Sequence, residues 1–337
     1  MPTFCRHNRF LANCPICSGD QVEVVSGRRT STAKPSSGGT TRTRGRAPAR
    51  SGGGGRGGGT LRIRQVAREQ EDGFHSSLVP GIKASAAAER LAEEIAFATA
   101  RLTLLASDPP GLYSEVAALA REEREEALWL AFLIAYLGPL DGDDPWAGVR
   151  AARVSWASGE PPALEGVPLG PRTAHDPARG AATLVAYRAW AERAGSQQVA
   201  FAGEEAWAPE RRFARAYERL ALPGLHRDAR FDLLVTLGEL GLVDMQAGAL
   251  QLGGSDDTTL AAKRVFGIAD TLLLERRAAD LASAGKVPLA VLDLAVWNWS
   301  RPPRPGTDGE RDRTKLGAVG AEPDADAYAR TAAALGL

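Results

Sequence analysis

The residue types best suited to metal chemistry gather at the start of the chain, in "FCRHNRFLANCPIC" (4–17). All three cysteines lie there, with one of the four histidines. Three thiolates and an imidazole form the closed tetrahedral ligand set of structural zinc, and a Cys-x-x-Cys step lets two thiolates share one ion. The alternative is three unrelated cysteines in a terminal segment. The spacing predicts a structural Zn²⁺ knuckle whose ligands are Cys5, His7, Cys14 and Cys17.

Carboxylates are the second group of candidate reactive residues, and we start with Asp293 in "VPLAVLDLAVWNW". Its neighbours three and four positions away are apolar or aromatic, and Pro288 suits a helix start. A carboxylate on an apolar helix face is unfavourable unless it has a partner or a chemical task. We therefore predict Asp293 as the working carboxylate. Two alternatives remain: Asp244, near a glycine-containing turn, and Asp232, whose stripe could be a solvated helix face.

Two helix–turn–helix stretches precede these aspartates: "LALPGLHRDARFDLL" (220–234) and "VFGIADTLLLERRA" (265–278). In a helix-hairpin-helix, backbone amides at the start of the second helix hold a DNA phosphate. For each stretch the alternative is a plain connection between two helices. If the hairpins contact DNA, we expect the contacts at Gly224, His226, Arg227, Arg230 and Gly267.

A carboxylate beyond a DNA-binding hairpin suits cleavage of the bond between a deoxyribose and its base. Cleavage builds positive charge on the sugar, which a buried carboxylate stabilises, or the carboxylate orients the attacking water. Lys263, before the second hairpin, is expected to contact phosphate; the alternative is attack on C1′ as a Schiff-base nucleophile. Trp297 and Asn298 are expected to line a pocket for an everted base, unless they belong to the core.

Apolar residues recur at three- and four-residue intervals through most of the segments that must position these residues. This spacing is typical of helices, so the sequence predicts an all-α fold. Alternating patterns that would suit a short strand occur only at 61–66 and 249–254. Long polar loops are expected at 158–178 and 301–326. The expected helices span 83–106, 112–138, 145–157, 178–194, 208–221, 228–240, 258–283 and 287–300, with one more at the C-terminus.

Charge is unevenly divided along the chain. The formal net charge is zero, but residues 1–68 carry 13 Lys or Arg against 2 acids, which leaves 41 − 13 = 28 bases and 41 − 2 = 39 acids. A basic arm on an acidic body is typical of a polyanion binder, and nucleic acid is the commonest polyanion. Residues 26–60 are arginines dispersed in glycine and serine, so we expect a disordered tether that contacts phosphates; a passive spacer is the alternative.

The predicted organisation is a zinc knuckle (1–25), an Arg/Gly-rich linker (26–60) and two helical subdomains (61–200 and 201–337). Because the few cysteines offer no disulfide framework, we expect a reducing cytoplasm. The longest apolar stretch, "ALWLAFLIAYLG", is too short to cross a bilayer. It predicts a buried helix, and no membrane role is expected.

Three segments resemble a known family, the alpha-glutamyl/putrescinyl thymine pyrophosphorylases of clade 3. They are "PGLHRDARFDLLVTLGELGL", "AAKRVFGIADTLLLERRAADLA" and "VPLAVLDLAVWNW", and the cysteine-containing N-terminus is a further likeness. The resemblance implies a helix-hairpin-helix DNA glycosylase fold and DNA-base chemistry. Phage relatives are linked to attaching amines to an activated hydroxymethyl base, and bacterial ones are similar to antiviral glycosylases. Asp228 stands where bifunctional glycosylases place a lysine, which favours a monofunctional enzyme.

Three functions follow as hypotheses, each with double-stranded DNA as the partner. The first is a monofunctional DNA glycosylase that everts and excises a modified phage base, such as a glucosylated or hypermodified one, in antiviral defence at the bacterial nucleoid. The second is a transferase that attaches an amine to an activated hydroxymethyl-pyrimidine. It would need a pre-activated base, because the sequence contains no G-x-x-x-x-G-K-[ST] phosphate loop. The third is a DNA-binding protein without catalysis, in which Asp293 is replaceable.

Overall fold

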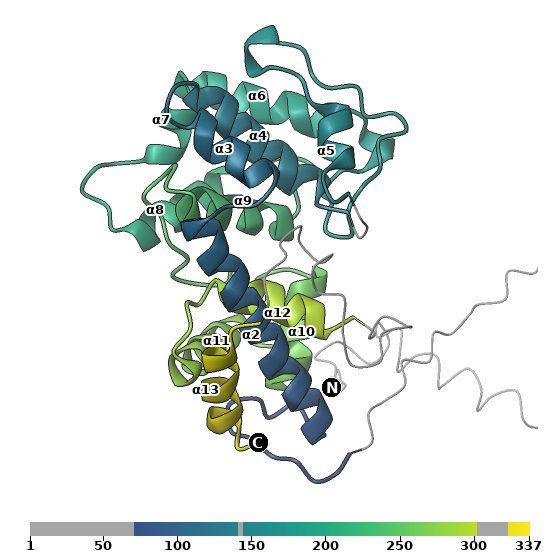
Figure 1. Ribbon diagram of the computed structural model, residues 1–337, viewed down its shortest axis with the longest axis vertical. Coiled ribbons are helices and arrows are strands. Elements are labelled where there is room, and N and C mark those ends of the chain that lie inside the picture. Colours follow the sequence, from purple (N-terminus) through teal and green to yellow (C-terminus); the bar gives the residue numbers. More distant parts are fainter. Residues whose placement is uncertain (1–70, 141–143, 302–322) are drawn as a thin grey trace, which may run out of the picture. The chain divides into compact units, whose positions relative to one another are not determined.

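The computed structural model describes residues 71–140, 144–301 and 323–337, which belong to one compact unit of the chain. All regular secondary structure in these residues is helical, which confirms the all-α prediction for them (Figure 1). The predicted zinc knuckle, the basic linker and the possible strand at 61–66 lie outside the described residues.

Most of the helices follow one another with short connections, but long loops connect α5 with α6 and α9 with α10. Two single-turn 3-10 helices, η2 (Trp156–Ser158) and η3 (Pro177–Arg179), lie at the two ends of the loop between α5 and α6. The α-helices are α2 (Ser85–Ser107), α3 (Leu112–Leu119), α4 (Arg124–Leu137), α5 (Ala147–Ala152), α6 (Ala182–Ala194), α7 (Gln197–Ala202), α8 (Pro209–Arg219), α9 (Arg227–Glu239), α10 (Asp257–Phe266), α11 (Thr271–Gly285), α12 (Val291–Trp299) and α13 (Ala325–Leu335).

Most expected helices are present, and the differences have local causes. The single helix expected over 112–138 is interrupted between α3 and α4, because 121–123 is a charged, exposed stretch with no apolar side chain to bury. The helix expected over 258–283 is divided at Gly267, whose φ of +64° ends α10. The short helix α7 was not expected, and residues 249–254 form a loop rather than a strand.

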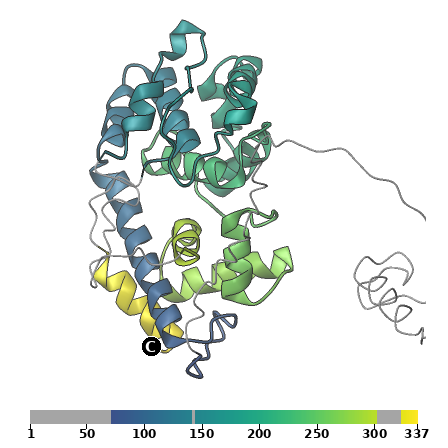
Figure 2. The ribbon, with the colours of Figure 1, turned by 90° about the vertical axis from the view of Figure 1, so that its right-hand side faces the viewer.

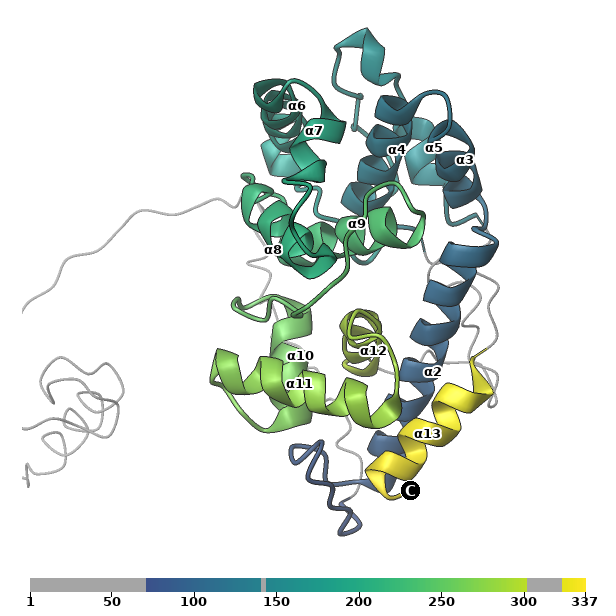
Figure 3. The ribbon, with the colours of Figure 1, turned by 90° about the vertical axis from the view of Figure 1, so that its left-hand side faces the viewer.

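Two groups of helices meet along α2. Helix α12 and the C-terminal α13 both pack against α2, while α4 packs against α3 and α9 (Figures 2 and 3). The indole Nε1 of Trp299 on α12 donates to the carbonyl of Ala87 on α2 at 2.9 Å, which fixes the register of this pair. Helix α2, from the first predicted subdomain, is therefore packed against helices of the second.

The apolar run of α4 forms the centre of the upper group in Figure 1. Every residue from Ala127 to Leu137 is buried, as predicted for this stretch. Aromatic rings stack beside it, with the ring centroids of Phe132 and Tyr187 3.7 Å apart. None of the described helices is long and apolar enough to cross a membrane.

Both predicted helix–turn–helix units form, α8–α9 and α10–α11. Gly224 has φ +80° in the first turn, where an added Cβ would lie 2.4 Å from the hydroxyl oxygen of Thr183. The second turn is covered by Gly81, whose amide donates to the carbonyl of Val265 at 3.0 Å. An added Cβ at Gly81 would meet backbone, so only glycine fits there. These turns set the directions of α9 and α11.

Candidate active site

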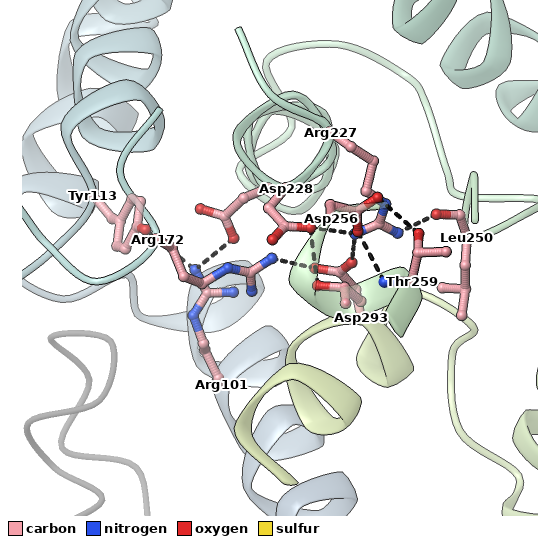
Figure 4. A network of polar contacts seen from close by, with 11 residues as sticks. Arg101, Tyr113, Arg172, Arg227, Asp228, Leu250, Asp256, Thr259 and Asp293 are labelled. Atoms are coloured by element: carbon pink, nitrogen blue, oxygen red, sulfur yellow. Dashed lines mark hydrogen bonds and ion pairs between the residues drawn. The ribbon is translucent and has the colours of Figure 1, made fainter. Parts of the chain in front are cut away.

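Asp293 lies in the first turn of α12 and is 3% exposed. Its Oδ2 accepts a hydrogen bond from Nη2 of Arg172 at 2.7 Å, and its Oδ1 accepts one from Nη1 of Arg227 (Figure 4). Arg172 comes from the loop before η3 and Arg227 from the first turn of α9. The carboxylate predicted from its apolar neighbours is thus a buried anion held between two arginines.

The charge state of Asp293 follows from these contacts. Burial by itself raises the pKa of the carboxyl group, but the charges and hydrogen bonds of Arg227 and Arg172 outweigh burial and hold the pKa below its ordinary value. Asp293 is therefore ionised at neutral pH. Its position at the start of α12 adds the favourable end of the helix dipole.

Arg227 ties Asp293 to the loop between α9 and α10. Its Nη1 also donates to Oδ1 of Asp228 at 3.1 Å, and its Nη2 donates to the carbonyl of Leu250. Glu275 on α11 holds the same loop, because its carboxylate accepts the amides of Leu250 and Leu252, each at 2.7 Å. Between these two lies Gln251 at φ 61°, a conformation that L-residues rarely adopt. The Arg227 guanidinium, expected to contact DNA, lies in this buried network.

A second arginine–aspartate pair adjoins the first. Nη2 of Arg101 on α2 lies 3.3 Å from Oδ1 of Asp232 on α9 and 3.2 Å from the hydroxyl of Tyr113. Asp232 was an alternative candidate for the working carboxylate, unless its stripe was a solvated helix face; its side chain is only 18% exposed. Arg101, itself 5% exposed, explains how that carboxylate is accommodated.

Two adjoining cavities open onto this network. The larger is a narrow cleft with a volume of about 40 Å³, and Trp297 and Asn298 line it together with Asp228 and Arg172. The smaller, of about 10 Å³, is lined by Asp293. Both cavities share Arg101, Asp232 and Leu294. The other residues of the cleft wall are Ala135, Gly138, Pro139, Pro171 and Ala229.

The cleft wall holds polar atoms that have no hydrogen-bond partner among the described residues. They are Nε of Arg101, Nε and Nη1 of Arg172, and Oδ1 of Asn298. The amide of Asn298 is fixed, because its Nδ2 donates to the carboxylate of Glu94 at 3.0 Å. Each of these atoms is buried from solvent, and buried polar atoms are nearly always paired in native proteins, so water or a ligand that reaches them would meet several donors and one acceptor.

An aromatic wall completes the cleft. Trp297 is 2% exposed, with the guanidinium of Arg172 5.2 Å from its ring centroid and that of Arg301 4.1 Å from it. The two residues predicted to line a base pocket, Trp297 and Asn298, are therefore both buried and both at the cleft. The two predictions are therefore compatible: both side chains belong to the core, and both also line the cleft.

Other predicted site residues lie elsewhere. Asp244 is in the turn after α9, with its side chain 72% exposed and paired with Arg212. Lys263 is half-buried in the last turn of α10 and lines neither cavity. His226 is exposed at the N-cap of α9, whereas Arg230 stacks on Tyr217, 4.2 Å from its ring centroid.

The two hairpin glycines and the metal ligands complete the set. Gly224 packs against Thr183, and Gly267 is exposed next to Gly81. The predicted zinc ligands Cys5, His7, Cys14 and Cys17 lie outside the described residues. Among the residues that the structure describes, no group of three or more His, Cys, Asp or Glu side chains could hold a metal ion.

Sequence reasoning missed several residues of the network. Arg172 lies in the proline-rich loop predicted to be a plain surface connection, and no local pattern connects it with Asp293, 121 positions away. Asp256 caps α10 through bonds to Thr259, and its position at the start of the helix after the first hairpin was a usable signal. Asp228 was noted only as the replacement of a lysine, although its place in the hairpin could have pointed to the site.

The fold and the network define a class: an all-helical protein with two helix–turn–helix units and a buried arginine–aspartate network beside a cleft. Residues 172–305 match the sequence model of one family, alpha-glutamyl/putrescinyl thymine pyrophosphorylase clade 3. The resemblance is thereby confirmed over 134 of the 337 residues, from Arg172 past Asp293. Comparison with the curated proteins and with the solved structures found no match.

Proposed function

We propose that this protein is a DNA glycosylase that takes an everted, modified base into the cleft at Trp297 and hydrolyses its N-glycosidic bond. The observation that carries the proposal is the adjacency of two features. A cleft with unpaired hydrogen-bonding atoms and an aromatic wall adjoins a cavity lined by the ionised Asp293. The first suits the edge and face of a base, and the second suits a sugar that becomes positively charged.

The cleft atoms fit the edge of a nucleobase. Free N–H groups of Arg172 and Arg101 match ring carbonyls or an unprotonated ring nitrogen, and Oδ1 of Asn298 matches a ring or exocyclic N–H. Every base carries both kinds of group on its Watson–Crick edge, so the set supports a base in general. The name of the matching family concerns thymine, which supports a pyrimidine. We propose a modified pyrimidine in phage DNA, excised in antiviral defence, as the substrate.

A transferase is the second candidate, and the name of the matching family, a thymine pyrophosphorylase, favours it. Such an enzyme would attach an amine to an activated hydroxymethyl-pyrimidine in DNA. The same cleft would then hold a base whose glycosidic bond stays intact, and Asp293 would pair with the incoming amine.

One assay separates the candidates. The protein is incubated with genomic DNA from phages that carry plain, hydroxymethylated or glucosylated cytosine, or modified thymine, and the products are scored as abasic sites, base adducts or neither. The glycosylase predicts abasic sites on one modified DNA, lost in Asp293→Asn and kept in Asp244→Asn. Base adducts would establish the transferase instead, and DNA binding without either product would leave a non-catalytic binder.

A folding control protects this assay. Asp293→Asn leaves two buried arginines without their anion, so its fold is checked by circular dichroism and thermal melting. If the variant unfolds, Asp293→Glu replaces it, because it keeps the charge but displaces the carboxylate. We expect Asp293→Glu to lower the rate at least about 100-fold, as displacement of a reacting group does. Wild-type rates in a folded variant would refute the role of Asp293.

We further propose that Cys5, His7, Cys14 and Cys17 bind one structural Zn²⁺. The support is their spacing and the pairing of three thiol groups with an imidazole. Elemental analysis of the purified full-length chain checks this, with zinc expected near one equivalent. Cys17→Ser should lose most of it, whereas Ser18→Ala should retain it. Equal zinc in the two variants would overturn the assignment.

A further inference from the structure

Asp228 and Asp293 face different cavities, while Asp232 lines both. Asp228 lines the larger cleft with Trp297 and Asn298, whereas Asp293 lines the adjoining smaller cavity. The side chain of Asp228 is 15% exposed and that of Asp293 4%. A base in the cleft would therefore meet Asp228, and the sugar end of the nucleotide would be the part nearer Asp293.

One guanidinium holds both carboxylates in place. Nη1 of Arg227 donates to Oδ1 of Asp228 at 3.1 Å and also to Oδ1 of Asp293 (Figure 4). The hydroxyl of Thr258 on α10 donates to the same Oδ1 of Asp228 at 2.9 Å. Both described bonds of the Asp228 carboxyl group thus end on one oxygen. The other, Oδ2, is the oxygen that a substrate in the cleft can engage.

We propose that Asp228 is a second catalytic residue, the acid that protonates the departing base. The inference rests on the proposed glycosylase function. The C1′–N bond breaks and its electron pair passes to the base nitrogen. The proton moves from Oδ2 of Asp228 to a nitrogen or carbonyl oxygen of the base. Water forms the new bond to C1′ and releases a proton to solvent, from which Asp228 is reprotonated.

The charges around Asp228 permit this role. Burial raises the pKa of its carboxyl group; the nearby Arg172 and Arg227 oppose the rise, but Asp293 and Asp256 reinforce it, and the pKa lies above its ordinary value. Asp293 is shifted in the opposite direction. Two carboxyl groups with pKa values driven apart are the usual arrangement of an acid and an anionic stabiliser. The charged groups that face Asp228 are Arg172, Arg227, Asp256 and Asp293, with Arg101 and Asp232 across the cleft.

The test is the pH dependence of excision on the DNA that yields abasic sites. Because Asp228 acts in its protonated form, the wild-type rate should fall as pH rises through the pKa of Asp228. Asp228→Asn cannot donate this proton. At the acidic end of the pH range we expect this variant to be about 100-fold slower than wild type. Its rate should not fall as pH rises, so the descending limb of the pH–rate profile should be absent, and at higher pH its rate should approach that of wild type. Asp257→Asn is the matched control, because Asp257 is exposed in the first turn of α10.

A second variant keeps the test decisive if Asp228→Asn fails to fold. Thr258→Val removes the hydroxyl that donates to Asp228 with little change in side-chain volume. Losing a bond to the ionised form raises the pKa of Asp228, so the descending limb should move to higher pH. A residue that only supported the fold would lower the rate at every pH and leave the limb in place.

The outcomes separate this inference from the proposed function. Abasic sites with parallel pH profiles in wild type and Asp228→Asn, or an unmoved limb in Thr258→Val, would overturn the acid role and leave the glycosylase standing. The absence of abasic sites on every DNA with the wild-type protein would overturn both. A vanished limb in Asp228→Asn together with a displaced limb in Thr258→Val would support the role.

Discussion

Asp293 and Asp244 both pair with arginine, and both were candidates for the working carboxylate. Asp293 is 4% exposed in its side chain and meets two arginines that are 12% and 5% exposed. Asp244 is 72% exposed, although its partner Arg212 is only 13% exposed. The ion pairs have the same chemistry, but solvent screens only the second. The comparison teaches that burial of the carboxylate, rather than position after a hairpin, distinguishes Asp293 from an ordinary surface acid.

The largest expected difference is in the free energy of unfolding. Asp293→Asn removes the anion between two buried guanidinium groups, and we expect a loss of about 3–5 kcal/mol. Asp244→Asn breaks a solvent-exposed pair and should cost at most about 1 kcal/mol. Urea unfolding followed by circular dichroism measures both values. Equal losses would show that the buried network contributes no more than the surface pair.

A smaller effect is expected where Glu275 holds the loop that supports Arg227. Glu275→Gln weakens two charge-assisted bonds, to the amides of Leu250 and Leu252. We expect a loss of about 2 kcal/mol and faster hydrogen exchange at those two amides. Glu218→Gln, which loses an exposed pair with Arg215, is the control and should change stability by less than about 0.5 kcal/mol. Unchanged exchange at both amides would contradict this support role.

The comparison also predicts a pH dependence. The pKa of Asp293 is lowered, so its contribution to stability is present above the ordinary pKa of aspartate, near 3.9, and is lost as pH falls through the lower folded value. The gap in unfolding free energy between wild type and Asp293→Asn should therefore narrow below about pH 4, by about 1.4 kcal/mol for each unit of pKa lowering. Unfolding curves at several acidic pH values measure the gap; a constant gap would mean that folding does not lower the pKa of Asp293.

The smallest effect on stability is expected from removing residues 1–60. That segment carries 10 of the 41 basic residues, and the network of Asp293 lies wholly outside it. We expect an unchanged unfolding free energy for the helical unit, but a shallower slope of log DNA affinity against log salt. Titrations at several salt concentrations measure the slope. A slope equal to that of the full chain would make the arm a passive spacer.

Much of the fold could be predicted, because local patterns decide it. The apolar spacing of α2, the apolar run of α4 and the buried carboxylate of α12 are all visible in consecutive residues. The interruption at 121–123 could not be placed, because charged residues at that point suit both an exposed helix turn and a break. Asp293 itself was predictable for a physical reason: an acid among apolar neighbours needs a partner.

The partners were not predictable by the same reasoning. Arg172 gave no local signal, because an arginine in a polar loop is ordinary until tertiary structure buries it. Arg227 was assigned to phosphate because it follows a hairpin, and only the packing of α9 turns it inward. Asp228 and Thr258 likewise meet only because α9 and α10 approach each other. The sequence pattern identifies a buried charge that requires a partner, and the three-dimensional structure identifies that partner.

The arrangement of Arg172, Arg227 and Asp293 also has a kinetic consequence. The two arginines are separated from the aspartate by 121 and 66 positions, so each ion pair closes a long loop. We expect such contacts to form late in folding, because the chain loses the entropy of loop closure before the ion pair contributes any stabilising free energy. During synthesis on the ribosome, the network of Arg172, Arg227 and Asp293 therefore cannot assemble until α12 has emerged.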